Sequence, residues 1–114
     1  MTDRPGVLII DGSAEYRTVF TAILATQGYE VVQAHDASAA VEALALRSFA
    51  VILLDLKMPH NGIAFLDYLG QSMPQLLSRT IVFVPWVNRS IWGVMSKPFR
   101  PEDLMKTVSA CALQ

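Results

Sequence analysis

The sequence is poor in cysteine, in charged residues and in long apolar runs, and each shortage excludes a class of protein. Among 114 residues there is one cysteine, Cys111, so an internal disulfide is impossible and a small disulfide-stapled secreted domain is excluded. Lysine and arginine number 9 against 10 aspartates and glutamates, which gives a net charge of −1. Without an excess of positive charge, a nucleic-acid-binding protein is not expected.

Apolar runs are too short for a membrane protein. The longest are Phe49–Leu54 and Ile81–Val87, the second of which is broken by Pro85. Both are far shorter than the roughly 20 residues that a helix needs to span a bilayer. Residues Met1–Gly6 contain no apolar stretch typical of a signal peptide. We therefore expect a cytoplasmic protein without membrane insertion.

Apolar residues, by contrast, are abundant. They make up 53% of the chain, whereas charged residues make up 17%, below the roughly 25% that is typical of soluble domains. Such a composition favours folding over disorder. The length predicts one domain over residues 1–114, with one core and no room for a second.

Two hydrophobic periods alternate along the chain. Short, continuous apolar runs rich in branched residues are typical of strands buried on both faces, and stripes of apolar residues three or four apart are typical of helices. The predicted strands are Val7–Ile10, Tyr29–Ala34, Ala50–Leu54, Thr80–Val84 and Trp92–Ser96. The predicted helices are Ala14–Gln27, Ala37–Arg47, Ile63–Gln71 and a last one beginning at Pro101.

This alternation predicts a doubly wound α/β fold with a parallel five-stranded sheet and helices on both faces. The fourth crossover is unusual, because only the six residues 85–90 lie between Val84 and Ile91. A parallel connection ordinarily needs a dozen or more residues and a helix. Either this crossover is a bare loop in an intact sheet, or the last strand is shortened, displaced or paired differently. We favour the loop, because the last helix then needs no rearrangement.

Three charged residues follow strands of the predicted sheet. Asp11, Asp55 and Lys97 come at the carboxyl ends of the first, third and fifth strands, the edge at which open α/β sheets bind ligands. Carboxylates suit Mg²⁺ and can attack phosphorus, and an ammonium can pair with a transferred phosphoryl group. Any one of these residues alone is better explained as a charged residue that ends a strand at the solvent-exposed edge of the sheet. All three together favour a metal and phosphoryl site.

The sequence resembles the receiver domains of two-component response regulators over nearly its whole length, with the strand order 2-1-3-4-5 that this family implies. The Asp-x-x-Met-Pro and Lys-Pro-Phe segments are specific in combination. The matching segments are Val7–Asp11, Arg17, Val51–Pro59, Gly62, Lys97–Phe99 and Pro101–Leu104.

The resemblance assigns roles to several residues. It implies that Asp55 accepts a phosphoryl group from a histidine kinase or phosphotransfer protein, and that Lys97 contacts that group. It further implies that Mg²⁺ is held by Asp11, Asp55 and the backbone carbonyl of Lys57. The Lys97–Pro98 bond is a candidate cis peptide. In such domains, phosphorylation biases a surface that binds or releases a downstream partner. No pattern for independent enzymatic turnover is present, so we do not expect an enzyme.

Departures from the family pattern are equally informative. Gly12 stands where the family has a second acidic residue, so Mg²⁺ binding is expected to be weaker. Pro85 replaces the Ser or Thr whose hydroxyl relays the switch, and Trp86 replaces a small residue. The fourth helix of the family is essentially missing.

Three functions remain open. In the first, the chain is an atypical receiver that signals as an interaction module, alone or as a homodimer, through its first and last helices and the segment Pro85–Gly93. In the second, it is a fully working phosphoacceptor. In the third, it is a pseudo-receiver that senses a nucleotide second messenger, because aromatic and guanidinium groups can stack on and pair with such a ligand. The residues that suggest this last function are Trp86, Arg89, Trp92 and Arg100. The simpler explanation is that the tryptophans cover core exposed by the missing helix.

Overall fold

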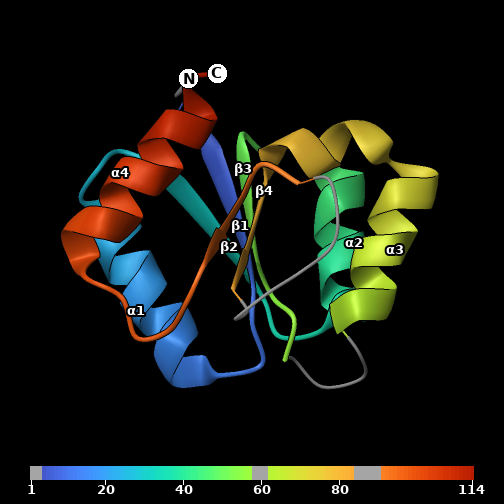
Figure 1. Ribbon diagram of the computed structural model, residues 1–114, viewed down its shortest axis with the longest axis horizontal. Coiled ribbons are helices and arrows are strands. Elements are labelled where there is room, and N and C mark those ends of the chain that lie inside the picture. Colours follow the sequence, from blue (N-terminus) through green and yellow to red (C-terminus); the bar gives the residue numbers. More distant parts are fainter. Residues whose placement is uncertain (1–3, 58–61, 84–90) are drawn as a thin grey trace.

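A computed structural model describes residues 4–57, 62–83 and 91–114. It confirms a five-stranded parallel sheet in the order β2-β1-β3-β4-β5, with helices on both faces (Figure 1). The strands are β1 (Gly6–Ile10), β2 (Glu30–Ala34), β3 (Val51–Asp55), β4 (Thr80–Phe83) and β5 (Gly93–Met95).

Two helices cover each face of the sheet. On one face lie α1 (Ala14–Ala25) and α4 (Pro101–Ala112), and on the other lie α2 (Ala37–Leu46) and α3 (Gly62–Ser72) (Figure 1). None of the helices in the described part of the chain is long and apolar enough to cross a bilayer. The layers therefore match the doubly wound arrangement that the alternating pattern predicts.

Side-chain alternation along β1 divides the interior into two cores. Val7 and Ile9 point to the core beneath α1 and α4, whereas Leu8 and Ile10 point to the core beneath α2 and α3. All four are 0% exposed, because successive residues of a strand face opposite sides of a sheet that is covered on both faces. The last helix buries Leu104, Val108 and Cys111, which are three or four residues apart, in the first of these cores.

Helix ends follow from local chemistry. The side chain of Ser13 accepts a hydrogen bond from the backbone N–H of Tyr16 at the start of α1, and that of Asp36 accepts one from Ala39 at the start of α2. Such caps satisfy N–H groups that have no partner inside the helix. After α1, Gly28 has a φ of 87°, a backbone conformation that other residues rarely adopt.

The fourth crossover keeps the parallel sheet, as we expected. β5 pairs with β4 in parallel register, with Ile81 opposite Gly93 and Phe83 opposite Met95, and no helix between the two strands appears in the described part of the chain. The prediction that the strand extends over Trp92–Ser96 is wrong at both ends, because the ladder includes only Gly93–Met95. The end of the predicted fourth strand, Val84, and the loop up to residue 90 lie outside the described residues.

One element was not predicted. A 3₁₀ helix, η1, runs over Pro74–Arg79 between α3 and β4. Its sequence signal is Pro74, a residue suited to a first helical turn because its ring fixes φ and its missing N–H would have no helical partner there. The hydroxyl of Thr80 donates to the carbonyl of Leu76 and ties this turn to the start of β4.

Candidate functional site

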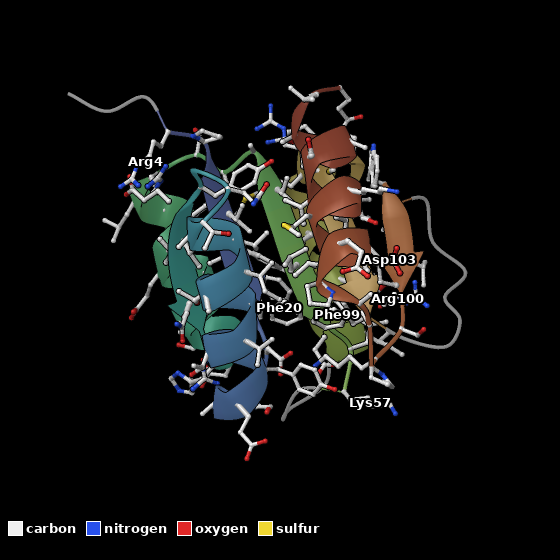
Figure 2. The ribbon with its side chains drawn as sticks, turned by 90° about the vertical axis from the view of Figure 1, so that its left-hand side faces the viewer. Arg4, Phe20, Lys57, Phe99, Arg100 and Asp103 are labelled. Atoms are coloured by element: carbon white, nitrogen blue, oxygen red, sulfur yellow. The ribbon has the colours of Figure 1, made fainter. Side chains whose placement is uncertain are left out.

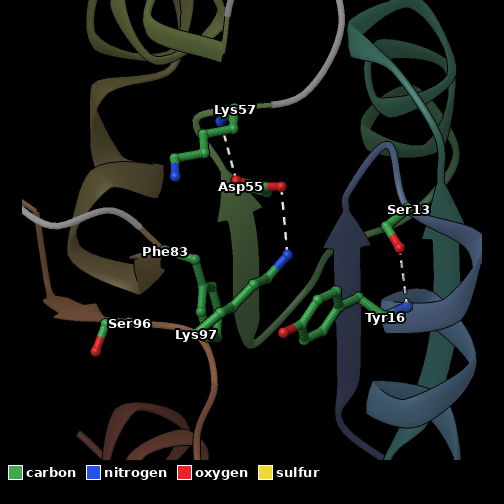
Figure 3. A pocket seen from close by; sticks show the side chains of 7 residues that line it. All are labelled: Ser13, Tyr16, Asp55, Lys57, Phe83, Ser96 and Lys97. Carbon is green, nitrogen blue, oxygen red and sulfur yellow. Dashed lines mark hydrogen bonds and ion pairs between the residues drawn. The ribbon is translucent and has the colours of Figure 1, made fainter.

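The three charged residues predicted to meet do meet at the carboxyl edge of the sheet. Asp11 follows β1, Asp55 ends β3, and Lys97 follows β5 by two residues. The Lys97 Nζ lies 2.5 Å from Asp11 Oδ2 and 3.3 Å from Asp55 Oδ2 (Figure 3 shows the second pair). The side chain of Lys97 is 17% exposed, that of Asp11 is 2% exposed and that of Asp55 is 13% exposed. The ammonium of Lys97 thus bridges two carboxylates at the carboxyl edge of the sheet.

Each carboxylate is also fixed by its own loop. Asp11 Oδ1 accepts from the backbone N–H of Ser13, and Asp55 Oδ1 accepts from that of Lys57, both at 2.9 Å. The Arg17 guanidinium donates to the carbonyl of Asp11 at 2.7 Å and braces the first of these loops. One oxygen of each carboxylate is thereby held by backbone, while the other faces Lys97. The Lys97–Pro98 bond is cis, as predicted.

Aromatic rings surround the lysine. Lys97 Nζ lies 3.8 Å from the centroid of the Tyr16 ring, and 5.8 and 5.9 Å from those of Phe20 and Phe83. An ammonium over a ring face is attracted by the ring quadrupole. Phe99, two residues after Lys97, stacks on Phe20 at 5.2 Å between α1 and α4 (Figure 2). The rings of Tyr16, Phe20 and Phe83 therefore add to the two ion pairs that hold Lys97.

A cavity of about 390 Å³ opens onto this site (Figure 3). Its lining is Ser13, Tyr16, Asp55, Lys57, Phe83, Ser96 and Lys97. Apolar spacing along α1 by itself would place Tyr16 only on the core-facing stripe of this helix. The residue does pack on that core, but its ring also contacts Lys97, a second role that no spacing rule signals.

The acidic pair supplies two of the ligands that a divalent cation would need. Asp11 and Asp55 supply hard oxygen ligands, which Mg²⁺ prefers. Among the residues that the structure describes, no group of three or more His, Cys, Asp or Glu side chains could hold a metal ion, since Gly12 adds no acid beside Asp11. A cation here would have to share two carboxylate oxygens with Lys97. The carbonyl of Lys57 as a further ligand stays a prediction.

Residues singled out for other roles are only partly placed. Pro85, Trp86 and Arg89 lie outside the described residues. Trp92 is partly buried and packs on the core beneath α1 and α4, as expected for a ring that covers core. Arg100 is exposed at the N-cap of α4. Nucleotide binding by these residues stays a prediction.

Comparison with known proteins identifies the family of the domain. The sequence profile described as the response regulator receiver domain matches residues 7–109. A 56-residue stretch is 36% identical to the CAI-1 autoinducer sensor kinase/phosphatase CqsS of Vibrio cholerae; this covers 49% of the chain and 8% of that protein. The chain therefore corresponds to a small part of this relative.

Solved structures of other proteins have a similar fold over almost the whole length of this chain. The chemotaxis protein CheY4 of Vibrio cholerae is 25% identical, with a TM-score of 0.83 over 95% of this chain and 98% of that one. The receiver domain of an HD domain-containing protein from Pseudomonas fluorescens Pf-5 is 22% identical and shares the fold, with a TM-score of 0.85 over 99% and 90% of the two chains. A profile match that spans most of the chain, on a sheet of this order, leads to one conclusion: the chain belongs to the receiver domain family of two-component response regulators.

Proposed function

We propose that this receiver domain accepts a phosphoryl group on Asp55 from a histidine kinase or phosphotransfer protein, and that its conformational switch is impaired. Receiver domains act with such donors and bind Mg²⁺ at the phosphorylation site. The observation that carries the proposal is the convergence of Asp11, Asp55 and Lys97 at the cavity on the carboxyl edge. The notable feature is that this group is intact although neighbouring positions depart from the family.

The chemistry follows from the arrangement. An Asp55 carboxylate oxygen attacks the phosphorus of a phosphohistidine, an O–P bond forms, the N–P bond breaks, and its electron pair stays on the imidazole nitrogen. The Lys97 ammonium, already 3.3 Å from Asp55, neutralises charge on the phosphoryl oxygens. Asp11 and Asp55 would hold Mg²⁺, which supplies further charge neutralisation when bound. This transfer is stoichiometric, and we propose no independent enzymatic turnover.

Two substitutions support an impaired switch. With Gly12 in place of an acid, a cation loses one charged oxygen ligand, so its affinity falls. Pro85 has neither a hydroxyl nor an N–H, so it cannot donate a hydrogen bond to a phosphoryl group. Phosphorylation would then alter the site without moving the rest of the surface.

A binding surface for the donor or a downstream partner is proposed on α1. Ala14, Glu15, Thr18 and Val19 line a shallow hollow on this helix, and Val19 is 44% exposed. Because α1 begins three residues after Asp11, a partner seated there could reach the cavity.

A homodimer through the same helix is the other outcome, and light scattering over a concentration series distinguishes the two. A molar mass that doubles in the wild type but not in Val19→Glu supports the homodimer and refutes a surface kept for other proteins.

Beryllofluoride, a phosphoryl mimic, tests the central proposal. The protein is titrated with beryllofluoride and Mg²⁺ while amide NMR signals are followed, with Asp55→Asn as the control. We expect weak binding that needs high Mg²⁺, with shifts confined to residues around Asp55. Shifts that spread to β5 and α4 would instead support a fully working receiver. The absence of shifts, together with no labelling of Asp55 by acetyl phosphate, would refute phosphoacceptance altogether.

A further inference from the structure

A second cavity lies at the amino-end edge of the sheet, away from Asp55. It measures about 360 Å³, and three arginines line it, Arg4, Arg47 and Arg79. Arg4 and Lys57 lie at opposite ends of the molecule, which shows how far this edge is from the phosphorylation site (Figure 2). The three arginines are remote in sequence and meet because β1, the end of α2 and the start of β4 all reach the same edge.

The Arg47 guanidinium is held in place. Its Nη1 pairs with Glu30 at 2.5 Å, its Nε donates to the carbonyl of Ser48 at 3.2 Å, and its Cζ lies 5.2 Å from the Phe49 ring centroid. Gly6 allows this position, since a Cβ there would stand 2.5 Å from Arg47 Nη2. The guanidinium therefore lies directly against the backbone of β1. An arginine fixed in this way loses little further freedom when it binds a ligand.

Basic side chains outnumber acidic ones at this cavity. Glu30 balances Arg47, but Arg4 and Arg79 have no acidic partner among the residues that the structure describes. Arg79 does donate from Nη1 to the carbonyl of Phe49 at 3.1 Å, and both residues line the cavity. Burial raises the pKa of the neighbouring Cys111 thiol to about 11, so at neutral pH it adds no negative charge.

We propose that this cavity binds a small molecule that carries a phosphate group. Arginine forks match the oxygens of phosphate in paired hydrogen bonds, and the compact double charge of a phosphate balances the two guanidiniums that lack a partner. The volume lies at the lower end of the roughly 300–1,000 Å³ of small-molecule sites, which suits a phosphate ester or a mononucleotide. This site is independent of the phosphoacceptor function proposed for Asp55.

The experiment is an NMR titration of the whole chain with pyrophosphate and with adenosine monophosphate, at constant ionic strength and without Mg²⁺. We expect saturable shifts at the amides of Gly6, Ser48 and Ala112, while those at Lys57 stay in place. Arg79→Gln should weaken binding at least tenfold. Arg100→Gln is the matched control, because it removes the same charge from an exposed arginine near the other edge and should change the affinity less than twofold.

A second variant keeps every charge and changes only geometry. Gly6→Ala pushes the flexible end of Arg47 off the backbone, so we expect a several-fold loss of affinity with an unchanged fold by circular dichroism. Equal weakening by Arg79→Gln and Arg100→Gln would refute a built site and leave general electrostatic attraction. The absence of saturable shifts would also refute it. Citrate binding as tight as that of pyrophosphate would overturn the phosphate assignment in favour of a carboxylate ligand. None of these outcomes depends on whether Asp55 is phosphorylated.

Discussion

Replacing Lys97 by methionine should cost this domain far more stability than removing the charge of Asp55, one of the two carboxylates that it bridges. Methionine keeps the apolar stem against the Tyr16 ring and removes only the ammonium. Asp11 and Asp55, 2% and 13% exposed, are then left facing one another without a counter-charge. Breaking a buried ion pair by removing one partner costs about 3–5 kcal/mol. Because Lys97 is itself 17% exposed, we expect the lower end of that range, about 3 kcal/mol.

Removal of one negative charge, instead of the positive one, provides the comparison. Asp55→Asn leaves a balanced pair, Asp11 with Lys97, and removes a repulsion between like charges, so the free energy of unfolding should be unchanged or rise by up to about 1 kcal/mol. Urea unfolding followed by circular dichroism, at pH 7 and without Mg²⁺, measures both variants. Lys106→Met, at an exposed position of α4, controls for the loss of a positive charge and should shift stability by less than about 0.5 kcal/mol.

Two results would refute this reasoning. If Lys97→Met unfolds within about 1 kcal/mol of the wild type, the ammonium does not neutralise the acidic pair to any useful extent. If Asp55→Asn is destabilised by more than about 1 kcal/mol, the hydrogen bond from the Lys57 N–H to the carboxylate matters more than the repulsion. Either outcome would require a different account of how the site is held before phosphorylation.

Three further predictions concern packing and titration. Gly62→Ala should destabilise by about 1–3 kcal/mol in urea unfolding, because a Cβ there would stand 2.6 Å from the Leu56 backbone, whereas Gly93→Ala meets nothing within 4 Å and should be tolerated. Phe20→Ala should cost about 3–5 kcal/mol, measured in the same way, because this 1% exposed ring contacts three other aromatic rings. For Cys111 the folded-state pKa of about 11 exceeds the reference 9.0, so its stabilising effect is complete below pH 9 and is lost as pH rises through 11. The free energy of unfolding should therefore fall between pH 9 and 11 by roughly 2–3 kcal/mol more in the wild type than in Cys111→Ala, and an equal fall in both would contradict the shift.

The sequence was a good guide where one residue's chemistry decided the outcome. The short apolar run Val7–Ile10, rich in branched residues, indicated a strand covered on both faces, and the structure confirms it. An aspartate before a helical run, such as Asp36, is typical of a helix cap because its carboxylate can accept from a free N–H of the first turn. Asp11, Asp55 and Lys97 could be brought together by one rule, since parallel strands end at a common edge. These predictions needed no knowledge of side-chain packing.

Packing and register decided what the sequence could not show. The length of β5 depends on how many residues of β4 it can pair with, and the ladder starts only at Gly93 although the apolar pattern begins at Ile91. The contact of Tyr16 with Lys97 depends on the angle between α1 and the sheet. The arginine cavity joins Arg4, Arg47 and Arg79, whose spacing in the sequence carries no signal.

The wide separation of the charged residues along the chain also sets an order of events during synthesis. Lys97 follows Asp55 by 42 residues and Asp11 by 86. At translation rates of about 5–20 residues per second, roughly 2–8 s pass between the appearance of the second carboxylate and that of the ammonium. If β1 pairs with β3 during that interval, Asp11 and Asp55 come together before Lys97 is present to neutralise them. Closure of this edge of the sheet is therefore expected to be more favourable once the segment that carries Lys97 has emerged.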